Sequence, residues 1–228
     1  MRFLCLHGQG TNSDIMKLQT RKFNFPLQTI ASLSELGALR SLLPVSYEYD
    51  FIDGEEHSES ADGLGQIYPG PYLQYASCAE TVPRSVEYLE ESMAEDGPFD
   101  GVIGFSQGAV CAARMILRSV ERDPYGPQPF KLAIFLCAAS LFYHKSADEY
   151  KEKMKAVTNI TIHIPTVHVI GQTDLHRPFS IDLLKLCDKK LSTVVDARMG
   201  HVIPQDVAST SKIQKAIELA VQQSGMGF

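Results

Sequence analysis

One serine of this chain lies in a sequence setting that suits a nucleophile. Ser106 is the central residue of Gly104-Phe105-Ser106-Gln107-Gly108, a G-x-S-x-G pattern. An apolar stretch that predicts a buried strand precedes the pattern, and residues 109–113 predict the start of a helix. A serine on such a tight turn needs glycines beside it, because other side chains would collide with the adjoining strand and helix. We therefore interpret Ser106 as a candidate nucleophile for acyl transfer.

A serine hydroxyl is a weak nucleophile at neutral pH and needs a base, with a third group to orient that base. After a nucleophile turn of this kind, an acidic residue and then a histidine follow in the chain, each at the carboxyl end of a strand. Asp174 follows the predicted strand 165–170, and His201 follows the predicted strand 192–196. We predict His201 as the base and Asp174 as the residue that orients it.

Other residues compete for these roles. Asp196 replaces Asp174 as the orienting residue if the last strand is shorter than predicted, and His176 is a candidate substrate-loop residue. His163 and His168 lie in or beside predicted strands and are expected to pack in the core.

Acyl transfer also needs donors for the oxyanion of the tetrahedral intermediate. One backbone amide is expected from Gln107, directly after the nucleophile, and one from the turn His7-Gly8-Gln9-Gly10 after the first strand. We assign Gln9 as the second donor and expect the His7 ring to buttress the turn.

Apolar runs of strand type alternate with helical patterns along the chain, which predicts an α/β fold with a mostly parallel sheet and helices on both faces. Together with the chain order of Ser106, Asp174 and His201, this alternation predicts an α/β-hydrolase fold in a single domain, 1–228, without internal repeats. The predicted strands are 2–6, 46–52, 99–105, 131–137, 165–170 and 192–196, and the predicted helices are 13–22, 29–43, 80–95, 107–121, 146–156, 179–190 and 206–223.

Residues 53–77 break this alternation with acidic residues, glycines, prolines and tyrosines. A loop of this length without regular structure is either functional or disordered, and its aromatic residues favour a cover over a pocket. We predict a substrate-binding role for Tyr68 and Tyr72 in this loop and for Phe142 and Tyr143, which follow another strand; a role as plain core residues is the alternative.

Composition excludes several classes of partner. The net charge is −6 and no cluster of Lys or Arg is present, which disfavours a nucleic-acid or anionic-membrane surface. No stretch of about 18 apolar residues predicts a membrane helix. The five cysteines are odd in number and scattered, which favours a reducing compartment, so we expect a cytoplasmic protein.

Four motifs in order resemble the small eukaryotic serine hydrolase family that is abundant in fungi: Leu6-His7-Gly8, Gly104-Phe105-Ser106-Gln107-Gly108, Gly171-Gln172-Thr173-Asp174 and Gly200-His201-Val202-Ile203-Pro204. The segment 68–72 also resembles the family's loop before the nucleophile strand. The resemblance spans nearly the whole chain and implies a minimal α/β-hydrolase core, no metal or organic cofactor, and esterase or thioesterase activity. The chain departs from the family at Gln9 and at Thr11-Asn12, which bears on the second oxyanion donor.

The sequence thus predicts a serine hydrolase that cleaves an acyl ester or thioester through an acyl-enzyme. By resemblance to some fungal members, the favoured role is a thioesterase that releases a polyketide or similar acyl chain from an acyl-carrier domain of its synthase. The alternative is a carboxylesterase acting on small free esters in secondary metabolism. An intact Ser, Asp and His set argues against a non-catalytic binding protein.

Overall fold

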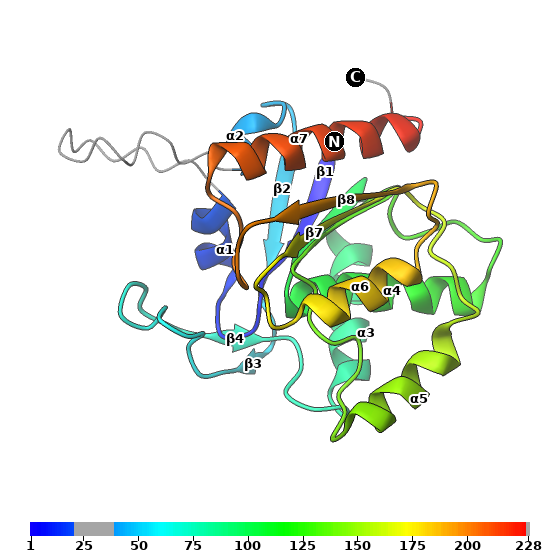
Figure 1. The fold of residues 1–228 in the computed structure, drawn as a ribbon, viewed down its shortest axis with the longest axis horizontal. Coiled ribbons are helices and arrows are strands. Elements are labelled where there is room, and N and C mark those ends of the chain that lie inside the picture. The colour runs from blue at the N-terminus through cyan, green and yellow to red at the C-terminus, as the bar shows by residue number, and fades with distance from the viewer. Residues whose placement is uncertain (21–38, 227–228) are drawn as a thin grey trace.

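A six-stranded parallel sheet forms the centre of the molecule (Figure 1). The computed structural model describes residues 1–20 and 39–226. The strand order is β2-β1-β5-β6-β7-β8, and every neighbouring pair is parallel. The strands are β1 (Arg2–Leu6), β2 (Glu48–Ile52), β5 (Gly101–Phe105), β6 (Leu132–Leu136), β7 (Thr166–Gly171) and β8 (Ser192–Ala197).

Helices cover both faces of this sheet, as predicted. Side chains of α1 (Ser13–Thr20), α2 (Leu39–Leu42) and α7 (Val207–Gln223) pack in one apolar core. Those of α3 (Val82–Asp96), α4 (Gln107–Arg122), α5 (Ala147–Val157) and α6 (Arg177–Lys185) contribute to the other. Alternate residues of a strand point to opposite faces, so Phe3 and Cys5 enter the first core while Leu4 and Leu6 enter the second. Both central strands β5 and β6 are buried along their whole length.

The strand order fixes where a ligand site can form. From β1 the chain continues to β2 on one side, whereas β5 pairs with the other side of β1. In open parallel sheets, the loops at the carboxyl ends of two such strands diverge and leave a crevice at this point. The residues after β1 and β5 are the turns at Gln9 and Ser106, so both lie at the crevice.

Most predicted elements agree with the structure to within a few residues. The predicted helix 29–43 falls largely outside the described residues, which include only its end, α2. Helix α6 begins at Arg177, two residues before its predicted start, because Pro178 occupies the first turn, where a missing N–H costs nothing. It ends at Lys185, five residues early, where the chain turns so that Ile162 and Cys187 bridge.

The segment predicted as a structureless loop, 53–77, contains a short antiparallel pair, β3 (Glu56–His57) and β4 (Leu73–Gln74). Leu73 also bonds with the turn after β1: its carbonyl accepts from the amide of Gly10, and its amide donates to the carbonyl of Thr11. The alternating pattern was too short to predict these strands, which are held by contacts with residues distant in the sequence. These bonds tie the excursion to the edge of the sheet that carries Ser106.

All five cysteines are free thiols, and four of them are buried. Burial raises the pKa of Cys111, Cys137 and Cys187 to about 12, so these thiols stay protonated at neutral pH. None of the helices in the described ranges combines the length and the apolar character that crossing a bilayer requires.

The two histidines predicted to pack in the core differ in the structure. His168 is fully buried in β7, where its Nε2 lies 3.1 Å from the Thr166 hydroxyl. His163 is exposed at 64% of its side-chain area beside Asp188, so that prediction was wrong. His163 lies before β7 begins, next to Ile162, whose backbone pairs with residues 186 to 188, so that Ile162 is buried and His163 is exposed.

The burial of His168 predicts a pH-dependent stability. Burial lowers its pKa from 6.5 to about 3, so the native state excludes a proton that the unfolded chain takes up. Stability is therefore full above pH 6.5 and falls as the pH decreases toward 3, by at most about 1.4 kcal/mol per pH unit from this one group. We expect His168→Gln to flatten the pH dependence of unfolding by urea between pH 7 and pH 5, whereas His163→Gln leaves it as in the wild type. Equal slopes in the wild type and His168→Gln would contradict the assignment.

Candidate active site

Ser106 lies on the turn between β5 and α4, in a backbone conformation that few non-glycine residues adopt. Its φ is 52° and its ψ is −113°. A Cβ on Gly104 would lie 2.5 Å from the backbone of Ala109, and a Cβ on Gly108 would lie 2.1 Å from the carbonyl oxygen of Leu6. Only glycine permits these approaches, which explains the G-x-S-x-G pattern physically. The turn holds the Ser106 side chain at the carboxyl edge of the sheet.

The structure brings Ser106, His201 and Asp174 together from three different strand ends. The Ser106 Oγ lies 2.8 Å from the Nε2 of His201. The Nδ1 of His201 lies 3.0 Å and 2.9 Å from the two carboxylate oxygens of Asp174. Because an ionised carboxylate only accepts, Nδ1 carries the proton and Nε2 is left to accept from the serine hydroxyl. The geometry is that of a serine prepared for deprotonation.

Asp174 is held in one orientation by its surroundings. Its side chain is fully buried, and one carboxylate oxygen accepts a hydrogen bond of 2.7 Å from the backbone amide of His176. Asp196, the alternative considered from the sequence, instead pairs with Arg177 at 2.8 Å on the surface. Strand β8 extends through Asp196 to Ala197, so this carboxylate belongs to the strand and not to the loop that carries His201.

The two amides predicted as oxyanion donors lie on the adjoining turns. Gln107 is the first residue of α4, so its N–H has no partner within the helix. Among the described residues, no acceptor bonds with the amide of Gln9. The helix start places the positive end of its dipole at the same point. Both amides remain candidate donors for a negatively charged oxygen.

A hydrogen-bonded scaffold fixes the turn that carries Gln9. The buried His7 has its Nδ1 2.8 Å from the carbonyl of Gly8, so Nδ1 donates, and Nε2 accepts from the amide of Gly54 at 3.0 Å. Burial lowers the pKa of His7, which keeps the ring neutral. Thr11 also donates to the Gly8 carbonyl, at 2.6 Å. The His7 ring thus buttresses the turn, as predicted, and Thr11, a departure from the family pattern, adds to that support.

The side chain of Gln107 has a second, structural role. Its Oε1 accepts from the amide of Tyr75 at 2.7 Å, and its Nε2 donates to the carbonyl of Ala76 at 2.7 Å. The hydroxyl of Tyr143 donates to the same carbonyl. The start of α4 is therefore joined to the segment after β4 and to the segment after β6.

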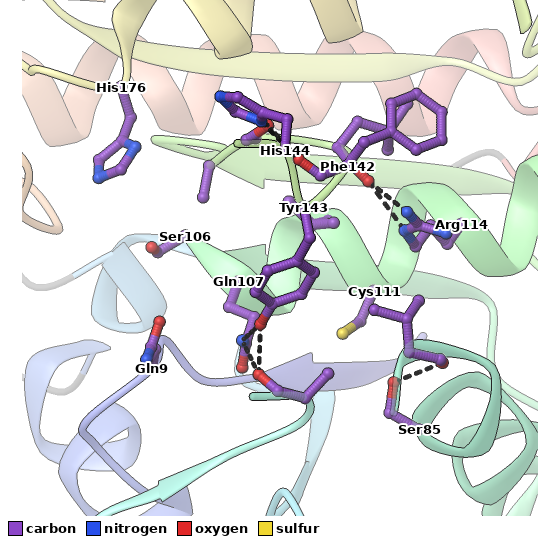
Figure 2. A pocket seen from close by; sticks show the side chains of 16 residues that line it. Gln9, Ser85, Ser106, Gln107, Cys111, Arg114, Phe142, Tyr143, His144 and His176 are labelled. Atoms are coloured by element: carbon purple, nitrogen blue, oxygen red, sulfur yellow. Dashed lines mark hydrogen bonds between the residues drawn. The ribbon is translucent and has the colours of Figure 1, made fainter. Parts of the chain in front are cut away.

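Two cavities meet at Ser106. The smaller, which we call the α4 cavity, has a volume of about 270 Å³ and runs along one face of α4 (Figure 2). The larger, which we call the histidine-side cavity, has a volume of about 660 Å³ and contains His201. Ser106, Gln9 and His176 line both. A substrate bound at Ser106 can therefore extend in two directions.

The four residues predicted to bind substrate are divided between these cavities. Phe142 and Tyr143 line the α4 cavity, and Tyr68 lines the histidine-side cavity together with Ala61, Asp62 and Leu64 from the same excursion. Tyr72 lines neither of the two; its hydroxyl donates to the carbonyl of Tyr68 and so supports that loop.

His176 lies beside the base. The centroids of its ring and the His201 ring are 4.6 Å apart. Burial, and then repulsion by His201, lower the pKa of His176, so it stays neutral and adds no charge next to His201. The sequence suggested it as a substrate-loop residue, and it lines both cavities.

Cys137, Asp174 and His201 are the residues of the described chain whose ligand atoms lie close enough to hold a metal ion, within 4.8 Å of one another. The atoms of Asp174 and His201 are the same ones that form the hydrogen-bonded chain to Ser106. A metal there would compete with that chain, and burial together with the Asp174 charge keeps Cys137 a neutral thiol. We therefore assign no metal to this group.

Sequence analysis missed the residues of α4 that line the cavity beyond the nucleophile. Val110, Cys111 and Arg114 follow Gln107 at intervals of three, four and seven residues, the spacing of one helix face. This spacing after a nucleophile serine is a signal that could have identified Val110 and Cys111, since the face next to Ser106 must border any substrate, whereas Arg114 is enclosed by residues distant in the sequence.

The parallel sheet, the strand-serine-helix turn and the acidic and histidine loops at its carboxyl edge define the molecule as an α/β-hydrolase of the serine type. The chain belongs to the family described as Serine hydrolase (FSH1), whose model matches residues 1–213.

Relatives and solved structures agree with this membership. The chain is 34% identical to Esterase FPY3 of Fusarium mangiferae over 100% of both chains. It is 28% identical to Hydrolase phiM of a fungal species (strain ATCC 74256), covering 96% of this chain and 94% of the relative. A carboxylesterase from Mesorhizobium loti has a similar fold, with a TM-score of 0.58 at 13% identity over 95% of this chain and 87% of the other. The chain is thus a serine hydrolase related to fungal esterases.

Proposed function

We propose that this chain hydrolyses an acyl ester or thioester through an acyl-enzyme on Ser106. His201 takes the proton of the Ser106 hydroxyl as the oxygen attacks the acyl carbonyl, and Asp174 stabilises the imidazolium. The amides of Gln107 and Gln9 donate to the oxyanion. His201 then gives the proton to the leaving group. The observation that supports this most directly is the hydrogen-bonded chain from Ser106 through His201 to Asp174.

The second half of the reaction uses the same groups. A water molecule enters on the side of His201, gives its proton to Nε2 and attacks the acyl carbonyl, after which Ser106 recovers the proton and the acid leaves. No step in this sequence requires a metal or an organic cofactor.

The two cavities suggest how a substrate is oriented. The leaving group must lie next to the Nε2 of His201 in order to receive its proton. His201 lines the larger cavity and not the α4 cavity. We therefore assign the leaving group to the histidine-side cavity and the acyl chain to the α4 cavity.

The size of the histidine-side cavity favours a long leaving group. A cavity of about 660 Å³ exceeds what the alcohol of a small ester fills, whereas the pantetheine arm of a thioester extends through such a space. Leu175 and Val202, which line this cavity, are exposed and apolar, a surface suited to contact with an acyl-carrier domain. We thus favour a thioesterase that releases a polyketide or similar acyl chain in the cytoplasm. The alternative is a carboxylesterase of small esters, in keeping with the name of the relative Esterase FPY3.

Replacement of Ser106 tests the reaction class. We expect Ser106→Ala to lower kcat for p-nitrophenyl esters by about 10⁵-fold or more, because the acyl-enzyme cannot form. Labelling by a fluorophosphonate should disappear as well. Ser119→Ala, further along α4, should keep both the hydrolysis of p-nitrophenyl esters and the labelling, and it serves as the control. Fluorophosphonate labelling of Ser106→Ala at another serine would contradict the assignment.

The two aspartates provide a matched test of the orienting residue. Asp174→Asn removes the charge that holds the Nδ1 proton of His201, so kcat should fall about 10³- to 10⁴-fold. Asp196→Asn weakens a surface pair with Arg177 and should leave kcat within about twofold of the wild type. Steady-state kinetics on one ester compares the two variants. A larger fall in kcat in Asp196→Asn than in Asp174→Asn would contradict the assignment of Asp174 as the orienting residue.

The leaving group separates the thioesterase from the carboxylesterase. We expect kcat/KM to be about tenfold higher for octanoyl-CoA than for the octanoyl thioester of N-acetylcysteamine, because only CoA carries the full pantetheine arm into the histidine-side cavity. The acyl group and the bond cleaved are the same in both. Equal values for the two thioesters, together with faster hydrolysis of ethyl octanoate, would favour the carboxylesterase.

A further inference from the structure

Arg114 is the charged side chain that lines the α4 cavity. Figure 2 shows Ser106, Gln9 and His176 toward one end of this cavity, Gln107 and Tyr143 across its middle, and Arg114 toward the other end. Gln107 and Arg114 are seven residues apart on α4, which places them about 10 Å apart along the helix axis. A chain attached to Ser106 and lying along α4 therefore leads toward Arg114.

The hydrogen-bonding capacity of Arg114 is only partly used. Its Nε and Nη2 donate to one acceptor, the carbonyl of Leu141, at 2.9 Å and 2.6 Å. A guanidinium has five N–H donors, so three remain for other partners. Among the described residues, no carboxylate lies within 4.0 Å of this side chain to form an ion pair, although Arg118 one turn later pairs with both Glu87 and Glu90.

The surroundings of Arg114 strengthen its interaction with an anionic partner. The side chain is partly buried, its guanidinium lies 5.0 Å from the centre of the Phe142 ring, and burial lowers its pKa despite the weaker attraction of Glu121. Among the described residues, no Asp or Glu lines the α4 cavity, and Arg114 is the Lys or Arg side chain of its wall. A charge-assisted, bidentate bond from a carboxylate is the strongest way to satisfy a guanidinium in such a place.

The other polar groups of the cavity are less suited than Arg114 to bind a carboxylate. The hydroxyls of Ser85, Ser140 and Tyr143 donate to backbone carbonyls of the protein. Cys111 is a buried, protonated thiol. Among the described residues at the distal end of the cavity, Arg114 thus retains N–H donors that no protein group accepts.

We propose that the α4 cavity selects acyl groups that carry a carboxylate at their far end, bound by Arg114. The preferred substrates are then monoesters or monothioesters of dicarboxylic acids. This inference rests on the proposed function, with the acyl chain in the α4 cavity, and names its substrate class.

Paired esters of equal length test the proposal. The mono-p-nitrophenyl esters of five- to eight-carbon dicarboxylic acids are compared at pH 7.5 with p-nitrophenyl esters of the monocarboxylic acids of the same length, after subtraction of enzyme-free rates. We expect kcat/KM to favour the carboxyl ester by about ten- to a hundred-fold at the best length, mainly through KM. Arg114→Gln should bring this ratio to about one, and Arg114→Lys, which keeps the charge but loses the fork, should retain part of it.

Arg118→Gln removes a charge from the next turn of α4 outside the cavity and should keep the wild-type ratio. If Arg114 only supports the segment around Leu141, Arg114→Gln lowers the rates for both esters together and leaves the ratio unchanged. An unchanged ratio in Arg114→Gln, or a wild-type preference for the neutral ester, would overturn the proposal.

Binding without turnover separates this proposal from the proposed function. Calorimetric titration of the wild type with the monoamide of octanedioic acid, which has one carboxylate, and with octanamide, which has none, should show tighter binding of the carboxylate, with the difference lost in Arg114→Gln. Equal affinities in the wild type would overturn the inference even if esters are hydrolysed. If no ester is hydrolysed while the Arg114-dependent affinity is present, the proposed function fails and the anion site stands.

Discussion

The close contact between the start of α4 and the end of β1 is the constraint on which the rest of the site depends. At Gly108 the helix lies so near the carbonyls of Leu6 and His7 that a Cβ would approach them to 2.1 Å and 2.6 Å. This contact brings the turn after β1 and the turn after β5 to the same point of the sheet edge. Ser106 adopts its unusual φ because the chain must leave a buried strand and enter a helix within one residue. The backbone strain at Ser106 is offset by the packing of the fully buried strands β5 and β6.

From this contact, hydrogen bonds extend to the segments after β4 and β6 that border the cavities. The Gln107 side chain holds residues 75 and 76, Tyr143 bonds with the same carbonyl, and Leu73 bonds with the turn at Gly10. Because backbone groups near a buried site must find partners, these bonds also give the irregular segment after β2 a defined path. The excursion therefore has a fixed position next to Ser106, although it contains little regular structure.

The sequence allowed the sheet, the helices and the proximity of His201 and Asp174 to Ser106 to be predicted, because each rests on local information. Buried parallel strands appear as apolar runs, and a G-x-S-x-G turn requires its glycines at fixed positions. The order of Asp174 and His201 followed from the strands that precede them. The β3–β4 pair and the exposure of His163 could not be predicted, because both depend on contacts with residues far away in the chain. Arg114 was overlooked for a different reason: an arginine at helical spacing normally faces solvent, and only the path of residues 139–144 over α4 encloses it.

Helix α4 gives the site a fixed scale of length. Its first turn presents unpaired amides beside Ser106, and its second turn provides the apolar Val110 and the thiol of Cys111 along the cavity. Arg114 follows on the next turn of the same face. A helix of 16 residues packed on β5 does not change its rise per residue, so the separation between Ser106 and Arg114 is set by backbone geometry rather than by loop conformation. If the acyl chain occupies this cavity, the helix that supports the nucleophile also determines which acyl chain length reaches Arg114. Variation in acyl length among related enzymes would then require a change in which turn of α4 carries the polar residue, while the turn at Ser106 stays the same.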